Sequence, residues 1–480
     1  MLDAQGHQVS EKYVYNIIKE DGFARLPRRS LYTRERASST FKLEAPKSVM
    51  LDFRPETFSA QNALGILCLL PYLDNYGIDK VIEQADYPET KAINRLCSIM
   101  SFVALKLSNV SRYSADDAWC MDRGLGLFAR LNVLPKTAWY TSYSSRVTRK
   151  MNRSFLKSLH QIYLQHDLLG DTANVDFTTI PYWGDRSHLE NNFSATRNKA
   201  LASMLAVLAQ DPDSGILTYG DTNIRHRNKS DVVIEFLDFY QSNSTDDELR
   251  YLVFDSKFTT YQNLKKLNER QIKFVTIRRR GKKIVENLNE KLASAWKKIR
   301  VPMADGKGRT LKVLDETVFL RDYGGKIRQI AITGHGKIKP ALLITNDFDR
   351  RGDEMIRKYT RRWLVEKGIC EQIEFFHLNR VSSSMVIKVD FDLTMSILAH
   401  NLLRLLAMNL PGYAHNTAFS LFNKFLSTTG SVEIKPDEIL AKMKKKRNLP
   451  ALLTAMEPFQ NKPISILGNR KLRFIGDTTS

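Results

Sequence analysis

Cysteine is scarce in this sequence, and a long uninterrupted apolar run is missing. Only four of the 480 residues are cysteines, and no two have CxxC spacing, which argues against a zinc site or a disulfide framework and fits a reducing cytosol. The longest apolar stretch, near 393–411, is interrupted by His400, Asn401 and Arg404, as in a buried helix and not a membrane span. The polar N-terminus does not resemble a signal peptide. We therefore expect a cytoplasmic protein without a membrane partner.

Acidic residues are few relative to basic ones. The chain has 73 Lys and Arg against 52 Asp and Glu, a formal net charge of +21. An excess of this size favours a polyanionic partner. With 43% hydrophobic residues, a chain of this length can bury a large core and form about three or four domains or subdomains.

The N-terminal region predicts a DNA-binding helix and basic arm over residues 1–50. A short amphipathic helix at 10–21, capped by Ser10 and ended by Gly22, precedes the basic stretches ARLPRRS and RER. It could be the recognition helix of a helix-turn-helix. A plain amphipathic helix with a solvated basic tail fits equally well.

Residues 51–170 predict a helical domain with possible DNA contacts on its basic side chains. The expected helices are 58–72, 76–84, 88–107, 115–130 and 144–166. The basic side chains are Arg146, Arg149, Lys150 and Arg153.

From residue 171 the pattern changes to short β-rich runs. Strands are expected at 173–180, 200–210, 216–224, 250–256 and 273–280, with helices at 230–242 and 260–271. The turn DPDSG separates the second strand from the third. We divide the remainder into a core segment at 171–283, a β-rich insertion at 284–350, closing helices at 351–410 and a basic C-terminal region at 411–480. The closing helices are expected as one long helix at 353–378 and a second at 391–409.

This order predicts an α/β fold of the ribonuclease-H-like type. It is a mixed sheet flanked by helices, interrupted by the β-rich insertion and preceded by the helical region. In such a sheet the first and fourth strands are neighbours, which would bring Asp176 beside Asp255, and Glu366 on the late helix would pack over them. Three carboxylates suit two hard divalent ions, Mg²⁺ or Mn²⁺, acting on a phosphodiester.

Each acid also has an ordinary structural explanation. Asp176 could end a strand, Asp255 could cap the next helix, and Glu366 could be a solvated helix acid. Four other acids compete for the same role, and Asp221 on the third strand is the reserve candidate. They are Asp185, Asp221, Glu371 and Glu374.

The stretch YTRRWLVE at 359–366 carries the third acid. On one helix, Tyr359, Arg362 and Glu366 would lie within about 60° of one another. Arg362 and Glu366 could form an i,i+4 ion pair worth only about 0.2–0.5 kcal/mol. Alternatively the guanidinium binds phosphate oxygens while the acid holds the metal and the phenol donates a hydrogen bond.

The spacing Y-x2-R-x3-E resembles the YREK signature of DDE transposases from bacterial insertion sequences of the IS-four type. Asp176 in VDFTTI and Asp255 in LVFDSKF resemble the settings of that family's first two acids, and a β-rich insertion before the Glu is similar too. The resemblance covers about 171–410. The signature's Lys would fall at 373, where this chain has Ile373, so that DNA contact is missing or moved.

The resemblance implies cut-and-paste DNA transposition. Two metal ions would support cleavage at a transposon end, and the freed 3′-OH would attack the opposite strand or the target DNA. It further implies a homodimer on paired double-stranded ends, a nucleoid-associated place in a bacterial cytoplasm, and a tryptophan that stacks on an extruded base. Trp296 is the candidate for that role, and a buried core tryptophan is the alternative.

Two basic runs could follow the DNA backbone. RRRGKK comes directly after the last core strand, and its candidate contacts are Arg278, Arg279, Arg280 and Lys282. A solvated strand end is the alternative. KMKKKR at 442–447 is more typical of a solvated helix face. Two other functions stay open, namely a domesticated, catalytically inactive DNA-binding protein and a ribonuclease-H-like nuclease without strand transfer.

Overall fold

The computed structural model describes residues 49–111, 116–181, 189–194, 198–242, 249–258, 260–302, 308–336, 339–378 and 386–477. All of them belong to one compact unit, residues 48–480. The predicted helix at 10–21, the basic arm and Asp185 lie outside the described residues.

One large sheet organises the chain from residue 172 to 345. Five of its strands are β2 (Thr172–Pro181), β4 (Lys199–Gln210), β5 (Leu217–Ile224), β6 (Tyr251–Phe254) and β7 (Lys273–Ile277). They lie in the order β5-β4-β2-β6-β7. β2 and β5 are antiparallel to β4, whereas β2, β6 and β7 are parallel to one another. This is the predicted ribonuclease-H-like arrangement, with the first strand beside the fourth, and the fold-class prediction is confirmed.

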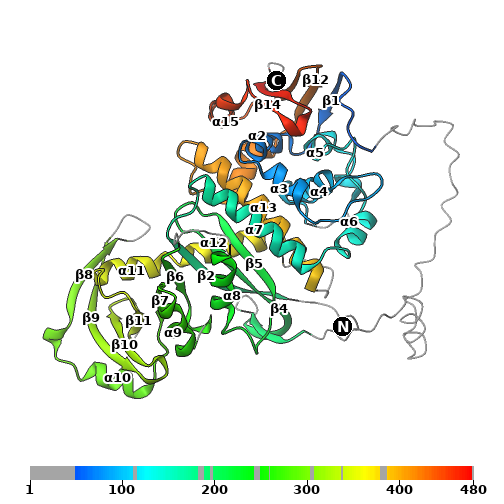
Figure 1. The fold of residues 1–480 in the computed structure, drawn as a ribbon. Coiled ribbons are helices and arrows are strands. Elements are labelled where there is room, and N and C mark those ends of the chain that lie inside the picture. Colours follow the sequence, from blue (N-terminus) through cyan, green and yellow to red (C-terminus); the bar gives the residue numbers. More distant parts are fainter. Residues whose placement is uncertain are drawn as a thin grey trace, which may run out of the picture. The chain divides into compact units, whose positions relative to one another are not determined.

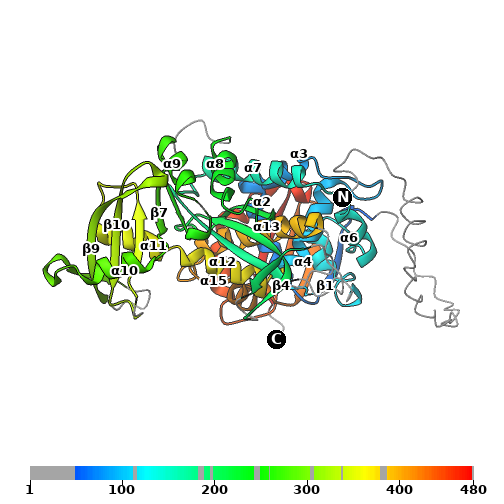
Figure 2. The ribbon, with the colours of Figure 1, turned by 90° about the horizontal axis from the view of Figure 1, so that it is seen from below.

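The strands after residue 284 extend this same sheet. They are β8 (Lys297–Pro302), β9 (Gly308–Leu320), β10 (Gly325–Thr333) and β11 (Ala341–Thr345), and a short β3 (Asn191–Ser194) pairs with β4 at the opposite side. β11 pairs antiparallel with β7, so the β-rich stretch continues the core sheet directly. In Figures 1 and 2 these strands lie at the end of the sheet away from β4. α10 (Lys282–Asn289) precedes them.

Helices cover the core strands. α8 (Val232–Gln241) and α9 (Tyr261–Glu269) connect β5, β6 and β7. α12 (Trp363–Glu374) packs on β2 and β4, and α13 (Val386–Asn409) packs on β5 and on the N-terminal helices (Figure 1). Gly368 permits the close approach of α12, because a Cβ there would lie 3.2 Å from Nε2 of Gln210 on β4.

The N-terminal region is mainly helical, with one exception. Its helices are α2 (Leu70–Asn75), α3 (Ile78–Gln84), α4 (Arg95–Leu107), α5 (Arg123–Phe128), α6 (Thr137–Ser144) and α7 (Arg149–Gln165), together with a 3₁₀ helix at Leu64–Leu69. The predicted helix at 58–72 is wrong at its start, because Glu56–Ala60 forms β1. β1 pairs with β12 (Gly430–Ile434), far away in the sequence.

The C-terminal region completes a second sheet. Within the described residues its order is β1-β12-β13-β15-β14, with β13 (Glu438–Met443), β14 (Pro463–Ile464) and β15 (Arg470–Gly476). α14 (Ala418–Leu421) and α15 (Leu449–Met456) accompany it. The run KMKKKR therefore begins at the end of a strand, and the expected helix face at 442–447 is wrong.

The single helix predicted at 353–378 is also wrong. It is divided into α11 (Gly352–Thr360) and α12, with Arg361 and Arg362 between them. No glycine or proline stands at this break, so its cause lies in contacts with other elements. Among the helices described, none is long and apolar enough to cross a membrane.

Candidate active site

Asp176 and Asp255 lie at matching positions of two adjacent parallel strands. The register pairs Val175 of β2 with Phe254 at the end of β6, and an aspartate follows each of them, Asp176 within β2 and Asp255 directly after β6. Adjacent strands are about 4.8 Å apart. Asp176 and Asp255, which are 79 positions apart in the sequence, therefore lie on neighbouring segments at the point where β6 ends.

Arg362 connects Asp176 to Glu366. Its Nη1 contacts Oδ2 of Asp176, and its Nη2 lies 2.6 Å from Oε1 of Glu366. Asp176 is largely buried, with 14% of its side chain exposed, whereas Glu366 is 52% exposed. The contact with Asp176 is thus the stronger of the two, because an exposed ion pair contributes only about 0–1 kcal/mol. Oδ1 of Asp176 accepts a hydrogen bond of 2.8 Å from the backbone N–H of Phe177.

Burial is the main influence on the ionisation of Asp176, and the neighbouring charges modify it. Burial raises the pKa of Asp176 to about 6, the Arg362 guanidinium opposes this, and the Glu366 and Asp255 carboxylates raise it further. Burial lowers the pKa of Arg362, but the surrounding acids raise it more, so it stays above its ordinary value. Burial raises the pKa of Tyr359 to about 12, so its phenol stays protonated and can donate a hydrogen bond.

The carboxylates of Asp176, Asp255 and Glu366 are groups that could bind a divalent cation, and Arg362 lies between two of them. Carboxylate oxygens are the ligands that Mg²⁺ prefers, and mutual repulsion among Asp176, Asp255 and Glu366 is relieved by positive charge. Among the described residues, however, no three His, Cys, Asp or Glu side chains are gathered closely enough to hold a metal ion. The guanidinium supplies the counter-charge instead, and the acids would need its release to converge.

The competing acids have other partners. Asp221 is buried on β5 and pairs with Arg149. Glu371 lies 3.3 Å from Nδ1 of His400, and Glu374 is exposed on α12. Arg362 therefore links Asp176 to Glu366, Asp255 follows the neighbouring strand without a contact to either acid, and the reserve candidate Asp221 belongs to a separate network. Ile373 packs against the core.

The predicted DNA contacts begin at the edge that carries the acids. Arg278 follows β7 and donates to Oε1 of Gln329 at 2.5 Å. Arg280 donates to the carbonyl oxygens of residues 339 and 340. Arg279 is exposed, and the exposed Lys282 lies 3.9 Å from Glu286.

Trp296 is half-buried. It packs against a small cluster formed by Leu288, Leu314, Ala331 and Leu342. Trp296 is therefore only partly buried, and both interpretations of it that the sequence left open remain predictions.

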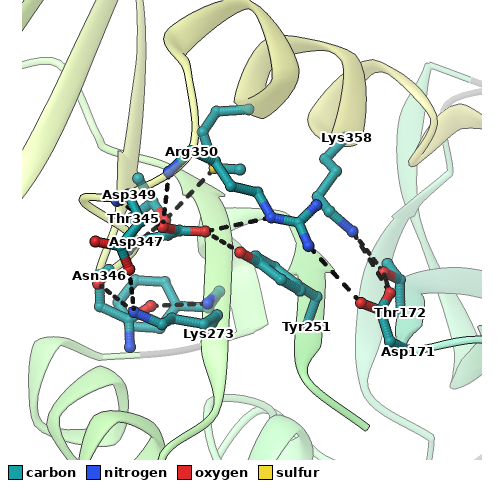
Figure 3. Close-up of polar contacts among 12 residues, drawn as sticks. Asp171, Thr172, Tyr251, Lys273, Thr345, Asn346, Asp347, Asp349, Arg350 and Lys358 are labelled. Atoms are coloured by element: carbon teal, nitrogen blue, oxygen red, sulfur yellow. Dashed lines mark hydrogen bonds and ion pairs between the residues drawn. The ribbon is translucent and has the colours of Figure 1, made fainter.

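Sequence reasoning missed several residues that hold α11 against the sheet. Tyr251 on β6 is buried and donates its phenol proton to Asp347. Two cations lie over the Tyr251 ring: the Arg350 guanidinium carbon is 4.5 Å and the Lys358 Nζ is 4.1 Å from the ring centroid. Lys358 also donates to Oγ1 of Thr172 at 2.6 Å. Figure 3 shows these side chains converging from α11, from the segment between β11 and α11, and from the starts of β2 and β6. The polar residues at alternate positions of β2 were the signal that could have indicated the missed contacts.

A family model matches the core segment of the chain. Residues 171–402 match the family model of the transposase DDE domain. That span begins directly before β2 and ends within α13, so it contains Asp176, Asp255 and Glu366. No curated protein sequence matches the chain. Among solved structures, the chain is similar to the piggyBac transposase in its synaptic complex with hairpin DNA, with a TM-score of 0.39 and 12% identity, over 75% of this chain and 79% of that one.

Proposed function

We propose that this chain is a DNA transposase that cleaves a phosphodiester at a transposon end and joins the freed 3′-OH to target DNA. One observation carries the proposal. Within the segment that matches the transposase DDE domain, Asp176 and Asp255 follow paired residues of adjacent parallel strands, and Arg362 links Glu366 to Asp176.

Each side chain then has a role. Asp176, Asp255 and Glu366 would hold two divalent ions, either Mg²⁺ or Mn²⁺. The positive charge of these ions would activate a nucleophile and stabilise the leaving oxygen. Arg362 would turn its guanidinium onto a phosphate oxygen, for which its planar donor pair is suited. Tyr359, whose ring centroid lies 5.6 Å from the Arg362 guanidinium carbon, would donate its phenol proton to the same phosphate.

Double-stranded DNA is the partner that the charge favours. The formal net charge of +21 attracts a polyanion, and Arg278, Arg279, Arg280 and Lys282 follow the end of β7 beside the acid edge. Trp296 would stack on an extruded base. As in the family that the sequence resembles, the active protein would be a homodimer bound to paired transposon ends. The transposon would be a bacterial insertion sequence.

Cleavage of DNA from the flanks of the coding sequence tests this proposal. The wild type should nick such DNA only with Mg²⁺ or Mn²⁺ present, and Glu366→Gln should abolish nicking. Glu374→Gln is the matched control, because it removes an exposed acid from the same helix and should leave the rate unchanged.

The reaction products distinguish a transposase from the two alternative functions. Binding without any nicking would indicate an inactive DNA-binding protein. Nicking without joining of the 3′-OH to a second DNA would indicate a nuclease without strand transfer. Equal nicking by the wild type and Glu366→Gln would refute the assignment of this site.

A further inference from the structure

The break between α11 and α12 has an unusual hydrogen-bond pattern. Arg362 N donates to the Tyr359 carbonyl at 3.1 Å, Leu364 N to the Arg361 carbonyl at 3.0 Å, and Val365 N to the Arg362 carbonyl at 3.1 Å. These are i→i−3 bonds, which tighten a helix locally. The tightened turn lies immediately before Glu366, so it determines where Arg362 and Glu366 point.

Alternate residues of β2 contact the chain through this break. Thr172 accepts a hydrogen bond of 2.6 Å from Lys358, Asn174 Nδ2 donates to the carbonyl oxygen of Arg361 at 2.9 Å, and Asp176 pairs with Arg362. Residues two apart on a strand lie on one face. One face of β2 therefore contacts the end of α11 once and the break twice, at three successive positions of the face, and Figure 3 shows the first contact.

The Arg361 side chain is attached to a different element. Its Nη2 lies 2.8 Å from the Pro212 carbonyl and 2.6 Å from Oδ1 of Asp213, in the turn between β4 and β5. Arg361 and Asp213 are both well exposed, so this contact is weak. Asn174 is fully buried, and its bond to the Arg361 carbonyl is shielded from water.

Packing alone gives no reason for an amide at position 174. The Oδ1 atom of Asn174 is buried without a hydrogen-bond partner in the structure, which is unfavourable for folding. A leucine has the same branched skeleton with bulkier ends and would leave no polar atom unpaired. The amide is therefore explained by what its nitrogen holds, the carbonyl of the residue next to Arg362.

We infer that Asn174 is a positioning residue of the acid site. Its amide fixes the Arg361 carbonyl, and through it the tightened turn that directs Arg362 and Glu366 towards Asp176. The role in catalysis rests on the proposed function, whereas the effect on the turn does not. Asn174 itself touches neither DNA nor the reacting atoms.

Hydrogen exchange at the break tests the structural half of the inference. In Asn174→Leu, the backbone amides of residues 361–366 should exchange at least about tenfold faster than in the wild type, because the turn opens locally. Asn401→Leu is the matched control. Asn401 is also fully buried and bonds the backbone N–H and carbonyl of Leu217 at 2.9 Å, but on α13, and its loss should leave exchange at 361–366 unchanged.

Kinetics of DNA nicking test the catalytic half. Displacement of a reacting group by about 1 Å can cost about 100-fold in rate, so kcat of Asn174→Leu should fall by at least about tenfold. The KM for DNA should change by less than about threefold, since the DNA-contacting side chains are retained. Asn174→Ala should behave in the same way if Asn174→Leu does not fold.

The outcomes separate the two claims. Unchanged exchange at 361–366 in Asn174→Leu overturns the inference, whatever the activity. Faster exchange with an unchanged kcat overturns the positioning role. If the wild type cleaves no DNA, the proposed function fails, and the exchange data still decide whether Asn174 holds the turn.

Discussion

Removal of the charge at position 176 should stabilise the folded protein. Burial and the carboxylates of Glu366 and Asp255, partly opposed by Arg362, raise the pKa of Asp176 from 3.8 to about 6. A pKa raised by this much corresponds to about 3 kcal/mol. Because the folded-state pKa is the raised one, the wild type loses this stability as the pH rises from about 3.8 to about 6. Asp176→Asn should therefore unfold with a free energy about 3 kcal/mol above that of the wild type at pH 8, and with little gain at pH 4.

Urea unfolding at pH 4 and pH 8, with a chelator present, measures this difference. Glu374→Gln is the control, and its change at an exposed position should stay within about 0.5 kcal/mol. Added Mg²⁺ at pH 8 should narrow the gap between Asp176→Asn and the wild type, because a ligand that binds only the folded wild type stabilises it. If Asp176→Asn is no more stable than the wild type at pH 8, the reasoning that burial makes the charged Asp176 carboxylate unfavourable is refuted.

Other predictions concern stability and DNA binding. Burial lowers the pKa of His160 from 6.5 to about 4, and neither ring nitrogen has a hydrogen-bond partner in the structure. The folded protein should thus lose about 3 kcal/mol as the pH falls from about 6.5 to about 4, and His160→Leu should remove that loss in urea unfolding at pH 7 and pH 4.5. Gly65→Ala should lower the unfolding free energy by at least about 1–3 kcal/mol, because its Cβ would lie 2.4 Å from the carbonyl oxygen of Phe425; an unchanged urea midpoint would contradict this. Affinity for DNA should fall steeply with added salt in a fluorescence titration, and a flat response would argue against a basic DNA path.

The core of the fold was predictable because its strands carry local signals. β2, β4, β5, β6 and β7 are short apolar runs bounded by turn residues, and their order along the chain is enough to indicate the sheet. β1 was not predictable, because its partner β12 lies about 370 residues later in the sequence. A strand whose only partner is that distant leaves no pattern in a local window.

The sequence was enough to choose three candidate acids, but not to predict their arrangement. Asp176, Asp255 and Glu366 were chosen because the predicted fold assigns each of them a place. The break at Arg361 and Arg362 has no glycine or proline to mark it and depends on contacts with β2 and the β4–β5 turn. For the same reason the position of Arg362 between Asp176 and Glu366 could not be read from helical spacing alone.

The central claim is that three acids from separate elements form one cation site that acts on DNA. Its most direct test replaces Mg²⁺ with Fe²⁺ and locates the positions at which the bound iron cleaves the polypeptide. With DNA, ascorbate and peroxide present, short-lived radicals cut the chain beside the bound ion. The account predicts cuts near residues 176, 255 and 366 that excess Mg²⁺ suppresses. Cuts elsewhere, with none near these three residues, would contradict it.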